Sequence, residues 1–144
     1  MVTRFYGIDQ ANEALPEVER ILLDLRDQRA DLIRLRDAVL QATGPDREGA
    51  TRGQAPGEAG SAAAEMRLMR LRMQGLIDQM QAGVTRLVER DVTLREIETG
   101  LIDFPALANG RLIWLCWRLG EAEIDWWHEH HDGFSGRRRL ADLT

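Results

Sequence analysis

The chain of 144 residues has no lysine, one cysteine and few aromatic side chains. Its strong cations are therefore all arginine, which favours a GC-rich coding bias over arginine-rich ion-pair networks. A single cysteine, Cys116, cannot form an internal disulfide, which fits a reducing compartment. No apolar run is long enough to cross a bilayer, and the N-terminal residues lack the apolar centre of a secretory signal. The sequence thus predicts a cytoplasmic protein with no membrane-bound segment.

The net charge of −5 excludes another class of partner. Affinity for nucleic acids comes mainly from the neutralisation of phosphates, so we expect no nucleic-acid partner. The length predicts a single domain over residues 1–144.

Two stretches have the apolar spacing of amphipathic helices, and residues 9–42 form the first. Asp9 can cap a short helix that ends at Ala14, and Pro16 suits the first position of a second helix that ends near Ala42. Residues 61–91 form the other helix. Its seam is Met66, Met69, Met73, Leu76, Met80, Gly83 and Leu87.

The segment between the helices, residues 43–60, contains five glycines and two prolines and has no apolar period. It predicts a flexible loop, either a tolerated insertion or a functional lid. The methionines of the seam either fill gaps in a helical interface or ligate a soft metal ion, and packing is the usual role. Both helices have apolar residues on more than one flank, and this apolar surface must be buried. A sheet and a second copy of the chain would bury it.

Residues 93–128 predict an antiparallel meander, with a leading strand near Thr93–Ile97. Asn109-Gly110 is a strong two-residue hairpin signal, and closing this turn places Asp103 opposite Cys116. The next turn lies around Gly120-Glu121. It predicts that Cys116 faces Asp125 and that Trp114 faces Trp127.

Alternation along the strands sorts the side chains onto two faces of this sheet. The apolar face, which should pack on the helices, carries Ile102, Phe104, Ile113, Leu115, Trp117, Ile124 and Trp126. The polar face carries Asp103, Trp114, Cys116, Arg118, Glu123, Asp125 and Trp127. Pro105 cannot donate to a ladder, so its strand should lie at an edge or bulge there.

Two interpretations of the polar face fit the sequence. It is either a solvated or subunit-contact surface with ion pairs, or a ligand pocket with walls of Trp114 and Trp127 and with Arg118 holding an anion. Exposed tryptophans could also dock a protein partner. Carboxylates on both sides of Cys116 should raise the pKa of its thiol and make it a poor nucleophile.

The residues that follow the meander, 129–144, predict a tail. His128, His130 and His131 are candidate metal ligands, but alternation along a strand allows at most two of them to share an ion. Gly133 to Gly136, followed by Arg137, is either a small anion-binding loop or a turn that places Phe134 in the core before a solvated arginine tail. The sequence predicts no cofactor.

Several motifs along the chain resemble an uncharacterised prokaryotic domain-of-unknown-function family, number 2203. They are Phe5, Ala11-Asn12, Leu15-Pro16, Gly100–Ala106, Leu115–Glu121, Ile124, Trp127-His128, Gly133-Phe134 and Gly136-Arg137. The resemblance implies a small bacterial protein and carries no known activity or catalytic residues. It points to six positions for testing: Asp103, Cys116, Arg118, Glu121, His128 and Arg137.

Together these patterns predict an α+β fold, in which a long antiparallel helical hairpin packs on a C-terminal antiparallel meander of three to four strands. The first functional hypothesis is a non-enzymatic homodimeric binding protein, joined through the helical seams, with a protein partner or a small anion. The alternative is a small-molecule- or metal-binding enzyme that uses Asp103, Cys116, Arg118, Asp125 and His128.

Overall fold

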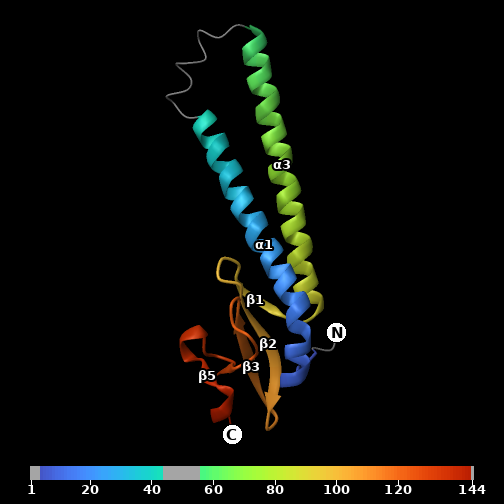
Figure 1. Cartoon of the computed structure of the whole chain (residues 1–144), viewed down its shortest axis with the longest axis vertical. Coiled ribbons are helices and arrows are strands. Elements are labelled where there is room, and N and C mark those ends of the chain that lie inside the picture. Colours follow the sequence, from blue (N-terminus) through green and yellow to red (C-terminus); the bar gives the residue numbers. More distant parts are fainter. Residues whose placement is uncertain (1–3, 44–55, 144) are drawn as a thin grey trace. The chain divides into compact units, whose positions relative to one another are not determined.

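The computed structural model describes residues 4–43 and 56–143 and has an α+β fold (Figure 1). Two long helices precede an antiparallel sheet, as the sequence predicts. The chain forms two compact units, of which the first contains residues up to Arg26 and from Ala82 onward, and the second contains Asp27–Gln81. Most of the predicted flexible loop, residues 44–55, lies outside the described residues. The prediction of a single domain stays a prediction.

Helix α1 spans Ile8–Ala42 without a break, so the predicted division into two helices was wrong. Pro16 lies inside the helix, on its exposed side. Its missing N–H costs one hydrogen bond, to the carbonyl of Asn12. The neighbouring residues Leu15 and Val18 are buried, and their burial offsets that cost.

Helix α3 spans Pro56–Glu89 and begins before the predicted start at residue 61. Proline is well suited to the first turn of a helix, because the N–H that it lacks has no partner there. Within the residues that the structure describes, neither helix has an apolar stretch sufficient to cross a membrane.

The sheet has five strands, one more than the largest number predicted, and their order follows the chain. They are β1 (Thr93–Glu96), β2 (Leu101–Ala108), β3 (Arg111–Arg118), β4 (Trp126–Glu129) and β5 (Arg138–Arg139). The additional strand, β5, lies in the predicted tail and pairs with β4. Short 3₁₀ turns at Phe134–Gly136 and Leu140–Asp142 flank it.

The hairpin between β2 and β3 confirms the predicted register. Asn109 and Gly110 form its turn with positive φ angles of 52° and 76°, and Ala108 pairs with Arg111. Asp103 consequently lies opposite Cys116.

The predicted register between β3 and β4 was wrong by one residue. Cys116 pairs with Trp126 rather than Asp125, and Trp114 pairs with His128 rather than Trp127. In the connection the Arg118 N–H donates to the side chain of Glu121 at 2.7 Å, and the pairing with β4 begins at Cys116. A longer connection shifts β4, and the shift exchanges the faces of its side chains.

One face of the sheet and the first part of α1 form the core of the first unit, and Figure 1 shows them side by side. The strand and loop residues predicted for this face are buried, except that Trp127 takes the place of Trp126. Tyr6 packs edge-on against Phe104, with ring centroids 4.9 Å apart. The backbone N–H of Ile124 donates to the side-chain oxygen of Asn12 at 2.7 Å, which ties the segment before β4 to α1.

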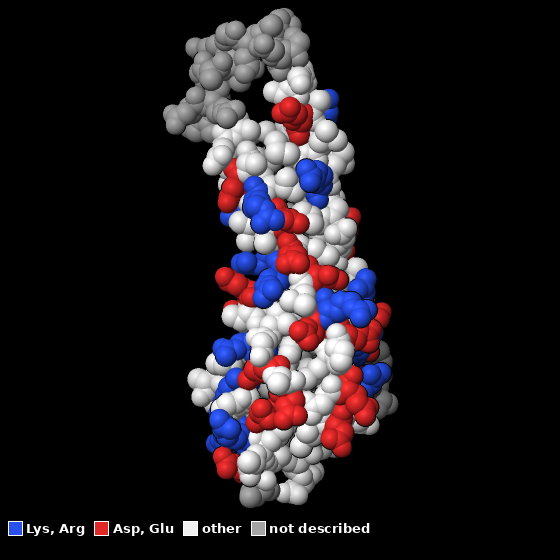
Figure 2. All heavy atoms as spheres, viewed as in Figure 1, with Lys and Arg blue, Asp and Glu red and all other residues white. Residues whose placement is uncertain are grey.

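The second unit has no buried residue among those that the structure describes. The methionines of the α3 seam are half-buried, whereas Leu68 and Leu71 are 60% and 68% exposed. Figure 2 shows acidic and basic side chains interspersed on the visible face of the protein.

Candidate functional site

Three neighbouring strands each contribute one polar residue to the face of the sheet away from α1. Asp103 comes from β2, Cys116 from β3 and His128 from β4. Each residue is at most 2% exposed. One ligand atom from each, a carboxylate oxygen, Sγ and a ring nitrogen, lie within 4.8 Å of one another. The predicted site residues Asp103 and Cys116 therefore lie together, and the shift of β4 adds His128 to them.

Only one of the two carboxylate oxygens of Asp103 has hydrogen-bond partners in the described part of the chain. Its Oδ2 accepts a hydrogen bond from Arg95 Nε at 2.8 Å and lies 3.0 Å from His128 Nε2. Its Oδ1 is buried and has no hydrogen-bond partner among the residues that the structure describes. A buried carboxylate oxygen without a partner is costly, so this atom is available as a ligand position.

The ring of His128 is oriented by a backbone group. Its Nδ1 lies 2.9 Å from the carbonyl oxygen of Glu129, which can only accept, so Nδ1 carries a proton. The Nε2 atom then faces the carboxylate of Asp103, 3.0 Å from Oδ2. A cation could bind between these two groups.

The pKa of the Cys116 thiol is raised from 9.0 to about 12. Burial is the largest cause, and the negative charge of Asp103 is the second. The positive charge of Arg137 opposes these effects only partly. The predicted direction is confirmed, but the second carboxylate expected beside the thiol, Asp125, is exposed and lies outside the strand pairing. The thiol is neutral at physiological pH and is a weak nucleophile.

Trp114 organises the rim of this cluster. The guanidinium of Arg95 lies 5.1 Å from the centroid of its ring, and the ring of His130 stacks on it at 5.5 Å. Its Nε1 donates to the carbonyl oxygen of His130 at 3.2 Å. Trp114 thus holds the side chains of β1 and of the turn after β4 in fixed positions.

The predicted solvated arginine tail is confirmed for Arg138 and Arg139, which are exposed, but was wrong for Arg137. The predicted core position of Phe134 was also wrong, because this side chain is 40% exposed. Arg137 donates to Glu121 at 2.8 Å, and its side chain is only 10% exposed. Its guanidinium lies 4.6 Å from the ring centroids of both Trp126 and Phe134. These contacts fix the segment against the same face of the sheet.

A cavity of about 320 Å³ opens beside the cluster. Its walls are Arg95, Leu101, Asp103, Cys116, His128, His130, His131, Asp132, Gly133 and Phe134. Sequence reasoning missed Arg95, because the irregular pairing between Leu94 and Glu96 that aims it cannot be read from the residue pattern.

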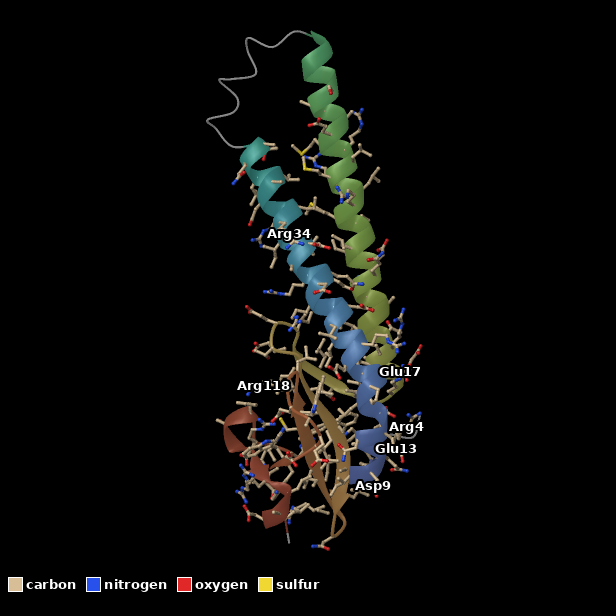
Figure 3. All side chains as sticks on the ribbon, viewed as in Figure 1. Arg4, Asp9, Glu13, Glu17, Arg34 and Arg118 are labelled. Atoms are coloured by element: carbon tan, nitrogen blue, oxygen red, sulfur yellow. The ribbon has the colours of Figure 1, made fainter. Side chains whose placement is uncertain are left out.

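Of the other predicted site residues, the metal candidates His130 and His131 line this cavity. The remaining ones do not; they are Trp114, Arg118, Asp125, Trp127 and Arg137. Trp127 is 3% exposed and belongs to the core face, so the predicted tryptophan pair with Trp114 is absent. Arg118, which Figure 3 labels, is exposed and lies 5.5 Å from the ring of Phe134. Asp125 is also exposed.

Comparison with known proteins gives one match. A family model described as an uncharacterized conserved protein, DUF2203, matches residues 4–140. No curated protein and no solved structure matches the chain. Because the family model spans nearly the whole chain, the protein belongs to the DUF2203 family of uncharacterized conserved proteins.

Proposed function

We propose that this protein binds a divalent metal ion of the zinc type through Asp103, Cys116 and His128, and keeps one coordination position open to the cavity. The observation that carries the proposal is the buried convergence of three ligand atoms within 4.8 Å. The buried Oδ1 of Asp103, which has no hydrogen-bond partner among the described residues, is a second observation that supports it.

The kinds of ligand select the metal. Zinc binds thiolate sulfur, imidazole nitrogen and carboxylate oxygen, usually in a tetrahedron, whereas magnesium and calcium prefer oxygen alone. Sites that hold zinc with three protein ligands and leave the fourth position open are typical of exchangeable or catalytic ions. The ligands here come from three adjacent strands, and a sheet holds them more rigidly than a loop would.

Neighbouring groups already orient two of the three ligands. The Nδ1–H of His128 donates to the Glu129 carbonyl, which directs Nε2 toward the cluster. Arg95 binds Oδ2 of Asp103 and leaves Oδ1 for the ion. Contacts of this kind fix ring orientation and raise metal affinity in known sites.

Binding would release the proton of the Cys116 thiol, because thiols ligate a metal ion in their deprotonated form. The positive charge of the ion would thereby compensate the negative charges of the buried thiolate and carboxylate.

The test uses the full chain without a histidine tag, stripped of metal by a chelator and titrated with Co²⁺ and Zn²⁺. We expect one ion per chain and a thiolate-to-cobalt charge-transfer band. Cys116→Ser should abolish that band, and His128→Gln and Asp103→Asn should each weaken Zn²⁺ binding by about tenfold or more. Asp125→Asn is the matched control, because Asp125 is an exposed carboxylate outside the cluster.

Two results would overturn the proposal. One is the absence of stoichiometric binding to the folded chain, with folding checked by circular dichroism. The other is Zn²⁺ binding of unchanged affinity in Cys116→Ser.

We also propose, from a different observation, that the chain forms a homodimer through its helices. Leu68 and Leu71 lie about one helical turn apart on α3 and are 60% and 68% exposed. Burial of these apolar side chains against a second copy of the chain would be favourable. Size-exclusion chromatography with light scattering should give the mass of a dimer, and Leu68→Ser combined with Leu71→Ser should give a monomer. A monomer of the unmodified chain at micromolar concentration would contradict this second proposal.

A further inference from the structure

The cavity beside Asp103, Cys116 and His128 is large enough for a ligand as well as an ion. Its volume of about 320 Å³ lies at the lower end of the range of small-molecule sites. The three proposed metal ligands occupy one wall. The remaining wall contains a guanidinium, two imidazoles, one carboxylate and the apolar side chains of Leu101 and Phe134.

Arg95 is the strongest ligand-binding group on that wall. Its Nε is used by Asp103, at 2.8 Å from Oδ2, and its guanidinium lies 5.1 Å from the Trp114 ring. No other hydrogen bond of this guanidinium is formed among the residues that the structure describes, so its Nη donors remain available. A guanidinium held by an ion pair and an aromatic face is already ordered, and it loses less entropy when it binds an anion.

The charges around the cavity favour an anion near Arg95. A divalent ion would balance the carboxylate of Asp103 and the thiolate of Cys116, which leaves the positive charge of Arg95 unbalanced. Asp132 is the one other carboxylate among the residues that line the cavity, and its Oδ1 lies 3.9 Å from His131 Nε2. The negative charge of Asp132 would repel an anion from the part of the cavity that this residue lines.

We infer that the open coordination position takes an oxyanion group of a small molecule, and that Arg95 binds the same group. Carboxylates and phosphates share this chemistry, because each can ligate the ion through one oxygen and accept from the guanidinium through another. The inference rests on the proposed metal site and defines the class of molecule that the site would accept.

The test uses the full chain loaded with Co²⁺, whose visible spectrum reports ligand exchange at the ion. Inorganic phosphate and acetate are the two probes, and chloride at the same ionic strength controls for screening. We expect phosphate, acetate or both to change the spectrum with saturation, and the comparison of their affinities identifies the preferred group.

Three variants separate the roles of the charged residues. Arg95→Gln should keep cobalt binding but weaken the affinity for the anion by about tenfold, the value of a charge-assisted hydrogen bond. Asp132→Asn should strengthen that affinity. Arg118→Gln is the matched control, because Arg118 is exposed and does not line the cavity.

The outcomes distinguish this inference from the proposal beneath it. A chain that does not bind Co²⁺ refutes the metal site itself and the inference with it. A cobalt-loaded chain whose spectrum is unchanged by both anions refutes the inference alone. Equal effects of Arg95→Gln and Arg118→Gln also overturn it, because they would show that Arg95 has no specific role.

Discussion

Raising the pH should destabilise the metal-free protein through Cys116. The thiol pKa is about 12 in the folded chain, against 9.0 as its ordinary value, because the side chain is buried beside Asp103. The unfolded chain therefore loses this proton at a lower pH than the folded chain does. Stability from this group is complete below the ordinary pKa and is lost as the pH rises through the folded pKa.

The size of the effect follows from the two pKa values. Between about pH 8 and about pH 10 the group should lower the free energy of unfolding by about 1.4 kcal/mol, because the unfolded thiol ionises over this range and the folded thiol does not. The full loss, of about 4 kcal/mol, would be reached only above the folded pKa.

Urea denaturation of the chain and of Cys116→Ala at both pH values measures this effect, with a chelator present throughout. Other groups titrate in both proteins, so the difference between their pH dependences isolates the thiol. We expect the unmodified chain to lose about 1.4 kcal/mol more than the variant. Identical pH dependences would refute the burial of an un-ionised thiol at this position.

Two further predictions concern the turns and the C-terminal segment. Gly100 has φ of 66°, and a Cβ there would lie 2.3 Å from Leu119 Cγ, so Gly100→Ala should cost about 2–5 kcal/mol in urea unfolding. Gly110→Ala should cost only about 1–2 kcal/mol, because its φ of 76° is similar but the space is open; equal costs would contradict the steric explanation. Arg137→Met should cost about 3 kcal/mol by leaving the charge of Glu121 without a counter-ion, and adding Glu121→Gln should recover part of this loss. A double variant no more stable than Arg137→Met would speak against the ion pair.

Local signals in the sequence were sufficient for the first hairpin of the sheet. The Asn109-Gly110 turn has one favourable geometry, and the alternation of Ile113, Leu115 and Trp117 agrees with it. Both signals therefore give the same register, and the opposition of Asp103 and Cys116 follows from it.

The connection to β4 carries no comparable signal. Its length depends on the hydrogen bond between Glu121 and the Arg118 N–H, and a side-chain contact of this kind cannot be read from the residue pattern. The actual register, which differs by one residue, places Trp127 on the core face and His128 on the same face as Cys116. The pairing of Asp103 with Cys116 was thus predictable from turn chemistry, and His128 was a candidate from the sequence. The position of His128 beside them and the role of Arg95 required the tertiary structure.

Continuity through Pro16 has a similar explanation. By local preference alone, Pro16 indicates the start of a helix. The burial of the flanking side chains of Leu15 and Val18 overrides that preference, and the helix continues through the proline. Arg137 was assigned to a solvated tail for a similar reason, because its partners Glu121 and Trp126 are distant in the sequence.

The hydrogen bond between Asn12 and Ile124 joins residues 112 positions apart in the chain. It fixes the segment that leads into β4 to the N-terminal part of α1, and it therefore helps to position His128. A chain shortened by its first dozen residues would keep every ligand of the candidate centre and yet lose the anchor that sets the position of one of them. The integrity of the centre can thus be impaired from the opposite end of the polypeptide, without any change in the strands that hold it.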